Sequence, residues 1–584
     1  MTDFSRIRDC IGQIYDVEAV PGVMGRLEIM LLGKYSSLPR PATRGLSERD
    51  AMLITYPDQI RDPDKPPLEC LHEFAEQRLR GMLNGIHLLP FYPSSSDDGF
   101  SVVDYRSVDP EYGDWEDIAR LEGRFRLMFD AVVNHASVRG AWFKAFLRNE
   151  DPYKDYFVTV KGDADLSAVV RPRTLPLLTK FPAATGDRAV WTTFGADQAD
   201  LNYSNPGVLL EMLDLLLFYV AQGATFIRLD AIAYLWKEAG TTCIHRPQVH
   251  AIVRLMRAVL DHAAPHVMLL TETNVAHAEN MSYLGDGSNE AHLVYNFALP
   301  PLILHSFHSG QAATLSDWAA GLSLPSEEPA FFNVLATHDG IGLNGAREIL
   351  TEKEILELAR RTEASGGRIG MSSNSDGTSS PYEINANYYD AMGSSGSSTD
   401  TELGAARFLT AHAVMLAFKG MPGVYFHSLF GSRGWHDGVS RSGQARSVNR
   451  EKLNRAALEE ELAKPATLRS HIYCGMRRLL RARQRSAAFA PRSEQCVLRA
   501  GSGVFAFTRG PESDGGQVLC VHNVTAREQT FPCNAWKAGA GTKRQVEDLI
   551  GARRYDWHSM VSLHLRPFQS MWLRISSGRD GIGD

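Results

Sequence analysis

The sequence has few cysteines, and they follow no pairing pattern. Seven cysteines are scattered along 584 residues, and no two are separated by only two or three positions. That spacing predicts neither a disulfide framework nor a zinc site. No apolar segment approaches the roughly 18 residues that a membrane span requires. The first residues, Met1 to Arg6, lack the layout of a secretion signal. We therefore expect a cytoplasmic protein that binds no membrane.

An excess of basic charge is also missing. Sixty-one Lys and Arg stand against 68 Asp and Glu, which gives a formal net charge of −7 at pH 7. A protein that binds nucleic acid generally carries a concentrated basic face, so we expect no nucleic-acid partner. The hydrophobic fraction of 44% and the charged fraction of 22% are typical of a soluble globular protein.

Eight short apolar runs recur along the chain, and amphipathic helical stretches lie between them. The runs cover residues 51–56, 85–90, 126–133, 224–230, 267–272, 292–297, 331–337 and 422–426. Nearly continuous apolar strands that alternate with helices predict a parallel (β/α)₈ TIM barrel. The alternative, an open doubly wound sheet, would need a Gly-rich phosphate turn after its first strand. The sequence has no such turn.

The chain is too long for one core, so we expect two or three domains. We predict an N-terminal helical extension over 1–50, barrel segments over 51–134 and 206–487, an insertion over 135–205 and an antiparallel β domain over 488–584. The insertion is rich in Pro, Thr and Asp and too long for a simple loop. Residues 360–400 are Ser- and Gly-rich, which indicates either a disordered linker or a mobile lid at an active site.

Polar residues, most of them ionisable, end or directly follow several of these runs, and in a TIM barrel such positions meet at one rim. They are Asn134, His135, Arg228, Asp230, Glu272, His338 and Asp339. Arg228 and Asp230 point the same way because strand side chains alternate, so the arginine can hold the aspartate ionised. A single strand-end aspartate often caps a helix. Three carboxylates at one rim instead suit glycoside cleavage, which needs a carboxylate pair flanking one bond.

These residues lie in segments that resemble the signature blocks of the α-amylase superfamily. The segments are Asp130-Ala-Val-Val-Asn-His135, Arg228-Leu-Asp230, Leu270-Thr-Glu-Thr273 and Thr337-His-Asp339. The resemblance implies that Asp230 is the nucleophile, Glu272 the general acid/base and Asp339 the transition-state stabiliser. It also implies that His135, Arg228 and His338 bind the glucosyl ring, and that the insertion and the tail are the family's B and C domains.

Further segments resemble the sucrose-phosphorylase branch of that superfamily. They include His87-Leu-Leu-Pro-Phe91, Asp97-Asp-Gly-Phe100, Lys237-Glu-Ala-Gly-Thr241 and His338-Asp-Gly-Ile-Gly342. The likeness implies a donor subsite built by Asp97, Phe100, Phe194 and Tyr234, although each aromatic taken alone could be ordinary core. It places Arg173 and Tyr382 at phosphate and Arg446 near the nucleophile. For Arg173 alone, a surface salt bridge is an equal alternative.

One loop departs from the sucrose-cleaving pattern. Those members read Asp-Leu-Tyr-Gln where this chain reads Ser380-Pro-Tyr-Glu-Ile-Asn385. The loop and the chain length resemble the glucosylglycerate phosphorylase subgroup. That resemblance implies phosphorolysis of 2-O-α-D-glucosyl-D-glycerate to α-D-glucose 1-phosphate and D-glycerate. We expect Arg173, Arg446 and Arg450 to receive both anions in turn, and Glu383 to be bonded to an arginine or a hydroxyl.

The implied mechanism is double displacement, with inorganic phosphate as a substrate and with no metal or organic cofactor. Three alternatives stay open. The donor could be sucrose, sucrose 6′-phosphate or glucosylglycerol; water could replace phosphate, as in an α-glucosidase; or the barrel could be a non-catalytic transporter subunit or scaffold. The last predicts a lost carboxylate, which the sequence does not show. A homodimer is also left open.

Overall fold

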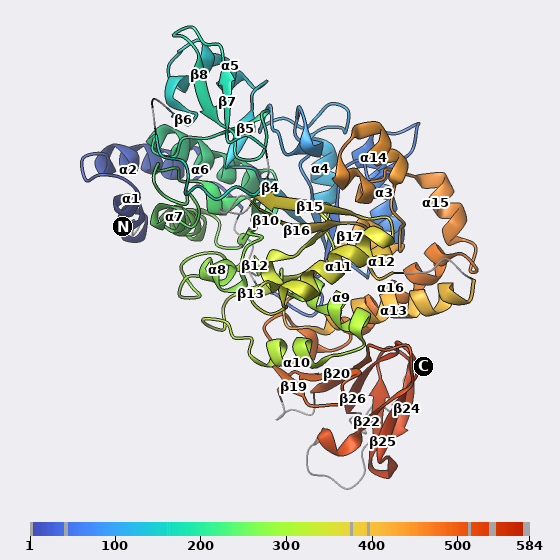
Figure 1. Cartoon of the computed structure of the whole chain (residues 1–584). Coiled ribbons are helices and arrows are strands. Elements are labelled where there is room, and N and C mark those ends of the chain that lie inside the picture. Colours follow the sequence, from blue (N-terminus) through green and yellow to red (C-terminus); the bar gives the residue numbers. More distant parts are fainter. Residues whose placement is uncertain are drawn as a thin grey trace.

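The chain was analysed as a computed structural model. It describes residues 4–39, 45–160, 162, 164–173, 175–373, 378–393, 398–511, 516–536 and 545–575. Eight parallel strands close into a barrel near the centre of the molecule, and helices surround it (Figure 1). The (β/α)₈ prediction is therefore confirmed.

Each of the eight predicted runs supplies one barrel strand. They are β1 (Met52–Thr55), β3 (Gly85–Leu88), β4 (Arg126–Ala131), β10 (Ala224–Leu229), β11 (Met268–Thr271), β12 (Leu293–Tyr295), β13 (Ala330–Asn333) and β17 (Met421–Tyr425). The order around the barrel is β1-β17-β13-β12-β11-β10-β4-β3. Nearly every strand residue is buried, as expected for a sheet covered on both faces.

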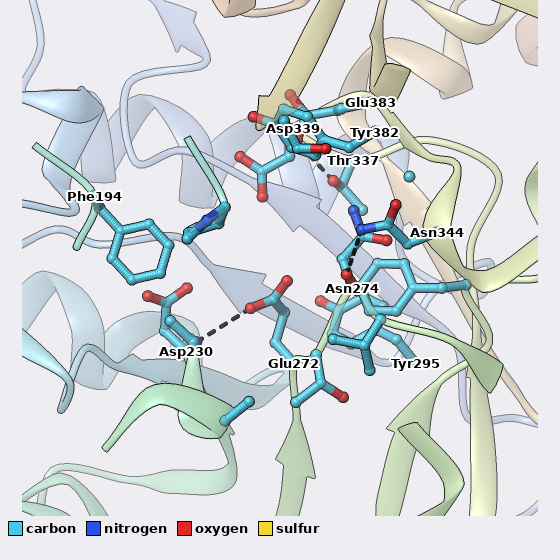
Figure 2. A pocket seen from close by; sticks show the side chains of 18 of the residues that line it. Phe194, Asp230, Glu272, Asn274, Tyr295, Thr337, Asp339, Asn344, Tyr382 and Glu383 are labelled. Atoms are coloured by element: carbon cyan, nitrogen blue, oxygen red, sulfur yellow. Dashed lines mark hydrogen bonds between the residues drawn. The ribbon is translucent and has the colours of Figure 1, made fainter. Parts of the chain in front are cut away.

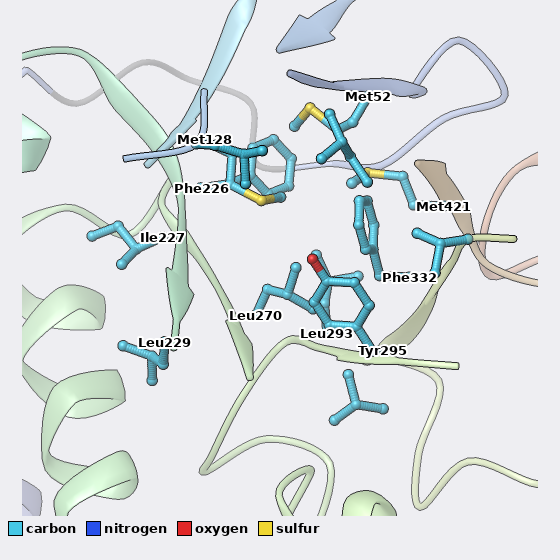
Figure 3. Packing of buried hydrophobic residues seen from close by; sticks show 14 of the residues in the cluster. Met52, Met128, Phe226, Ile227, Leu229, Leu270, Leu293, Tyr295, Phe332 and Met421 are labelled. Carbon is cyan, nitrogen blue, oxygen red and sulfur yellow. The ribbon is translucent and has the colours of Figure 1, made fainter. Parts of the chain in front are cut away.

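Two glycines make room for large side chains inside the barrel. Met52 pairs in register with Gly85 on one side and Gly423 on the other. A Cβ at Gly85 would lie 2.2 Å from Met52 Sδ, and one at Gly423 would lie 2.4 Å from the Phe332 ring. Figure 3 shows Met52, Phe332 and Met421 packed together in this space. Any side chain at either glycine would displace this packing.

Helices surround the barrel, and several of them begin at side-chain caps. They include α3 (Pro67–Arg78), α4 (Trp115–Glu122), α6 (Pro206–Ala221), α7 (Pro247–Ala263), α9 (Leu299–Ser309), α11 (Glu352–Ala364), α13 (Ser398–Ala417) and α16 (Leu468–Arg483). Asp114 and Asp117 form a capping box at the start of α4, and Asn205 caps α6 ahead of Pro206. The smaller helices are α5 (Ala141–Leu147), α8 (His277–Ser282), α10 (Ala313–Ala320), α12 (Tyr388–Ala391), α14 (His436–Ser442) and α15 (Arg455–Leu462).

The described part of the N-terminal segment contains two α-helices. Helix α1 (Ser5–Ile14) packs against α7, and α2 (Val20–Ile29) packs against α6 (Figure 1). Their buried faces consist of residues such as Ile7, Ile11, Val23 and Leu27. The extension therefore covers the outer side of two barrel helices.

The insertion after β4 forms small antiparallel sheets. Strand β5 (His135–Ser137) pairs with β9 (Gln198–Asp200), and β8 (Arg188–Trp191) pairs with both β6 (Thr159–Val160) and β7 (Leu178–Phe181). In Figure 1 these strands project from one end of the barrel. The domain boundaries given above stay a prediction.

The Ser- and Gly-rich stretch 360–400 has more regular structure than its composition suggests. It begins inside α11 and continues as β15 (Arg368–Ser373), which pairs with β16 (Ser379–Asn385). Strand β16 also pairs with β14 (Ile341–Gly342). Residues 374–377 and 394–397 lie outside the described residues. In its described part the stretch is a hairpin and helices, so the linker alternative is wrong there, because pairing with β14 supplies order that composition does not reveal.

The C-terminal strands form an antiparallel sheet, as predicted. Its order is β19 (Gln495–Leu498), β20 (Val504–Arg509), β21 (Val518–Asn523), β26 (Ser570–Ile575), β23 (Gln545–Asp548) and β24 (Arg553–Asp556). Two buried arginines, one from α16 and one from β20 of this sheet, meet at the end of α13. Arg483 Nε donates to Leu416 O at 3.0 Å, and Arg509 Nη1 donates to Ala417 O. They satisfy carbonyls that a helix end leaves without internal partners.

Candidate active site

A cavity of about 390 Å³ opens where the carboxyl ends of the barrel strands meet the insertion and β16. Fourteen of the residues singled out from the sequence line it. They are Asp97, Phe100, His135, Arg173, Phe194, Arg228, Asp230, Tyr234, Glu272, His338, Asp339, Tyr382, Glu383 and Arg446. Figure 2 shows the carboxyl groups of Asp230, Glu272 and Asp339 facing the same space.

Asp230 belongs to a buried network of charged side chains from two neighbouring strands. Arg228 on β10 pairs in register with Asp130 on β4. Its Nη1 contacts Asp130 Oδ1 and lies 2.9 Å from Asp230 Oδ1. The other Asp130 oxygen lies 2.8 Å from His87 Nε2 on β3. Asp130 does not line the cavity, but it fixes the arginine that does.

The end of β10 also positions Glu272. Ala231 has φ of 49°, a left-handed conformation that alanine rarely adopts, and its N–H donates to Glu272 Oε2 at 3.1 Å. Arg228 Nη2 lies 3.9 Å from the same oxygen. The backbone at Ala231 therefore orients Glu272 beside Asp230, the residue that precedes Ala231 in the chain.

Burial raises the pKa of Asp230 to about 8, against the opposing charge of Arg228, and burial also raises the pKa of Glu272. The contact between Arg228 and Asp230 is present as expected, but Arg228 also balances Asp130, so it does not offset the burial of Asp230. Two such carboxyls facing one cavity hold a proton together at neutral pH. Glu272 is the better place for it, because Arg228 is 1 Å closer to Asp230 (2.9 against 3.9 Å).

Asp339 is in the opposite electrostatic state. Its Oδ1 lies 2.7 Å from Arg446 Nη1 and 3.3 Å from Arg450 Nη2. Burial alone would raise the pKa of Asp339, but the guanidinium groups of Arg446 and Arg450 hold it well below its ordinary value. Asp339 is therefore ionised across the physiological pH range. The three carboxyls differ in their titration, as a site that performs acid/base and electrostatic work requires.

Aromatic side chains and His135 line part of the cavity. Phe100 stacks on His338 at 5.0 Å, and Phe194 packs edge-on against Tyr234 at 5.5 Å. His135 Nε2 donates to Phe100 O at 2.9 Å. These rings face the cavity as well as the protein core. Burial lowers the pKa of His338 to about 3, so its ring is neutral.

Asp97 reaches the cavity from a strained turn. Asp97, Asp98 and Gly99 have φ of 55°, 47° and 105°, and a Cβ at Gly99 would lie 2.7 Å from Pro90 O. Asp97 Oδ2 accepts from Arg173 Nη2 at 3.2 Å and from Gln198 Nε2 at 3.3 Å. Burial opposes ionisation of Asp97, but Arg173 and Arg446 lower its pKa.

Glu383 on β16 is bonded to an arginine, as expected. It accepts from Arg446 Nη2 at 2.7 Å and from Arg446 Nε at 3.1 Å. Arg450, which was expected to receive anionic substrates, does not line the cavity. It contacts Asp98 Oδ2 at 2.7 Å, His338 O at 2.9 Å and Asp339. Protein carboxylates and a carbonyl thus already occupy most of the guanidinium N–H donors of Arg446 and Arg450.

Several lining residues were not found from the sequence. They are Gln198, Tyr295, Asn274, Asn344 and Arg347, among others. Asn344 and Arg347 follow the His338-to-Gly342 segment by a few positions. Their closeness to Asp339 in the sequence could therefore have indicated that they line the cavity. Gln198 carries no such signal, because it comes from a short strand of the insertion.

Comparison with known proteins places this site in a family. The model of the α-amylase catalytic domain matches residues 80–323. The glucosylglycerate phosphorylase of Allomeiothermus silvanus is 47% identical over 97% of this chain and 98% of that protein. The chain belongs to the glucosylglycerate phosphorylase family. A relative of the same name from Spirochaeta thermophila is 45% identical over 98% of this chain and 99% of its own length.

Membership of the glucosylglycerate phosphorylase family confirms the resemblance drawn from the sequence motifs. The fold agrees too. The crystal structure of sucrose 6F-phosphate phosphorylase from Thermoanaerobacter thermosaccharolyticum matches with a TM-score of 0.72 at 24% identity. The match covers 83% of this chain and 96% of that one.

Among the described residues, no group of three or more His, Cys, Asp and Glu side chains is placed to hold a metal ion. Within the same part of the chain, no helix is long and apolar enough to cross a membrane.

Proposed function

We propose that this chain catalyses the reversible phosphorolysis of 2-O-α-D-glucosyl-D-glycerate, giving α-D-glucose 1-phosphate and D-glycerate with retained configuration. The observation that carries the proposal is the set of three carboxyls around one cavity, two with raised pKa and one with lowered pKa, in a chain of the glucosylglycerate phosphorylase family.

In the first half-reaction Asp230 attacks the anomeric carbon. The bond between that carbon and the glycerate oxygen breaks, its electron pair stays on the oxygen, and Glu272 donates the proton that the oxygen takes up. Asp339, held ionised by Arg446, stabilises the positive charge that develops on the sugar ring. The product of this step is a glucosyl ester of Asp230 and free glycerate.

In the second half-reaction an oxygen of phosphate attacks the same carbon and displaces Asp230. Glu272, now ionised, can take the phosphate proton. Burial raises the pKa of Tyr382, so its hydroxyl keeps its proton and can donate to a phosphate oxygen. Two inversions retain the α configuration. No step requires a metal or an organic cofactor.

The remaining lining residues have proposed roles in holding glucose. Both ring nitrogens of His338 are buried and make no hydrogen bond in the described part of the chain, and Nε2 lies 3.2 Å from Asp339 Oδ2. Sugar hydroxyls would satisfy them. Asp97, His135 and Arg228 add polar groups, and Phe100, Phe194 and Tyr234 add apolar walls. A cytoplasmic location suits an enzyme that uses inorganic phosphate and releases a sugar phosphate.

The test is the reverse reaction with glucose 1-phosphate and four separate acceptors: D-glycerate, fructose, fructose 6-phosphate and glycerol. Phosphate release should be fastest with D-glycerate by a wide margin. Preference for a neutral acceptor or for fructose 6-phosphate would reject the proposed substrate while leaving the double displacement intact. Cleavage of glucosylglycerate at equal rates with and without phosphate would identify an α-glucosidase instead.

A further inference from the structure

Five arginines line the cavity, and they differ in how their charge is balanced. They are Arg171, Arg173, Arg228, Arg347 and Arg446. Three of them are paired with carboxylates: Arg228 with Asp130 and Asp230, Arg173 with Asp97, and Arg446 with Asp339 and Glu383. An anionic substrate would have to compete with these carboxylates. Within the described ranges, no carboxylate forms an ion pair with Arg171 or Arg347.

Arg347 is held in place by neutral groups. It follows η5 (Asn344–Ala346) and is exposed at the mouth of the cavity. Its Nε donates to Asn344 Oδ1 at 3.0 Å, and its Nη2 donates to Ser380 Oγ at 3.1 Å and to Pro381 O. Nη1 has no hydrogen-bond partner among the described residues. The guanidinium is therefore oriented, while its charge and one nitrogen stay available to a carboxylate.

The position of Arg347 relative to Glu272 matches the place of the acceptor. Asn344, which accepts from Arg347, also donates to Asn274 O at 2.9 Å, and Asn274 is two residues beyond Glu272. In Figure 2 Asn274 and Asn344 lie on the opposite side of Glu272 from Phe194. Glu272 must reach the oxygen that links glucose to glycerate, so glycerate lies beside it. Phe194 belongs to the wall proposed for glucose, which leaves the Asn274 side for glycerate.

Two further observations fit a ligand at this place. Asn274 Oδ1 is buried at the cavity wall and has no hydrogen-bond partner in the described part of the chain. Arg347 lies next to Tyr382, because it holds the carbonyl of the preceding residue. A bound carboxylate at Arg347 would thus sit between the acid/base residue and the strand that the sequence singles out for phosphate.

We propose that Arg347 binds the carboxylate of the acceptor glycerate and so selects an anionic acceptor over a neutral one. The inference rests on the proposed function. It replaces the expectation that Arg446 and Arg450 receive glycerate, because both are occupied by protein carboxylates and carbonyls. Arg171 is less suitable than Arg347, since its Nη2 donates to Leu175 O and so holds the side chain within the insertion.

The experiment compares two acceptors of similar size in the same preparations. Wild type, Arg347→Ala, Arg347→Lys and the matched control Arg171→Ala are assayed with saturating glucose 1-phosphate and either D-glycerate or glycerol. Loss of a charge-assisted bond should lower kcat/KM for glycerate about tenfold or more, mainly through KM. The ratio of kcat/KM for glycerate to that for glycerol should fall by a similar factor. Arg347→Lys should fall between wild type and alanine, and Arg171→Ala should leave the ratio unchanged.

Transfer to glycerol also shows that each variant is folded. Equal losses with both acceptors would mean that Arg347 only supports Ser380 and Pro381, and would overturn the inference. An unchanged KM for glycerate, or a fall in the ratio for Arg171→Ala alone, would also overturn it. A wild-type enzyme that uses glycerate while Arg347→Ala is unaffected leaves the proposed function standing. A wild-type enzyme that uses glycerol but not glycerate removes both.

Discussion

The floor and the mouth of the cavity are built in different ways. At the floor, Asp130, Arg228 and Asp230 sit on or next to adjacent barrel strands, are at most 8% exposed, and are linked by direct ion pairs. At the mouth, Tyr382, Glu383 and Arg347 come from β16 and from the turn after η5, and Arg347 forms no ion pair with a described carboxylate. In the proposed function, the floor supports chemistry that any glucosyl donor needs, whereas the mouth would meet the part of the substrate that distinguishes one donor from another.

The largest expected effect comes from the floor. Asp230→Ala should lower kcat by about 10⁴-fold or more with every acceptor, because no covalent glucosyl intermediate can form. Initial rates of phosphate release with D-glycerate and glycerol measure it. Glu279→Gln, which changes another cavity-lining carboxylate, is the control. If Asp230→Ala spared one acceptor, the floor would not be common to all of them.

Asp130→Asn tests whether the floor extends beyond the residues that line the cavity. Removing one partner of a buried ion pair typically costs about 3 kcal/mol of stability. The loss of a nearby negative charge should also lower the pKa of the Asp230 and Glu272 pair, so the acid limb of the pH–rate profile should move to lower pH. Activity with glycerate and with glycerol should fall by the same factor, about tenfold. Thermal unfolding and the pH profile are the two measurements.

Glu383→Gln removes a negative charge from the mouth, whereas Arg347→Ala removes a positive one. It leaves Arg446 with Asp339 as its carboxylate partner, so the mouth becomes more positive. The preference for glycerate over glycerol should rise about threefold, by the Coulomb attraction of a partly screened charge. Competition between the two acceptors in one reaction measures the ratio. A ratio that falls would show that Glu383 itself contacts glycerate.

The smallest expected effect is on stability. It arises because ionising the buried carboxyl of Asp230 at the floor destabilises the folded chain. The pKa of Asp230 is about 8 in the folded chain against an ordinary value of 3.8. Asp230 and Glu272 share one proton, and a carboxyl pair with a raised folded pKa supports folding while it holds that proton, so this contribution is present below pH 4 and is lost as the pH rises through 8. Asp230→Asn, which cannot ionise, should therefore melt a few degrees above wild type at pH 8.5. The difference should vanish near pH 4; an equal difference at both values would point to packing instead.

The sequence predicts the floor better than the mouth, for physical reasons. Apolar runs that end in ionisable residues such as Asp230 and Glu272 specify both the barrel strands and the rim on which they meet. The hairpin of β15 and β16 is hidden by Ser and Gly, because its order comes from pairing with β14. The sequence does not distinguish Arg347 from an ordinary surface arginine, because only the fold shows that it lines the cavity without an ion pair to a described carboxylate.

The raised pKa of Asp230 at the floor could not be predicted from the sequence either. The neighbourhood of Arg228 and Asp230 is predictable from strand alternation, and it indicates an ionised aspartate. The raised pKa depends on burial and on Asp130, which shares the same arginine from another strand. Such sharing is a property of the register between β4 and β10 and cannot be read from either segment alone.

The arginines at the end of α13 have a consequence for how the chain is made. Arg509 Nη1 donates to Ala417 O across 92 positions of sequence. On a ribosome, which releases the chain from its N-terminus, this bond cannot form until residue 509 has left the exit tunnel. The helix before the last barrel strand β17 therefore reaches its final set of hydrogen bonds only when part of the C-terminal sheet has been synthesised. A chain stopped at residue 487 would contain every barrel strand and still lack this closure.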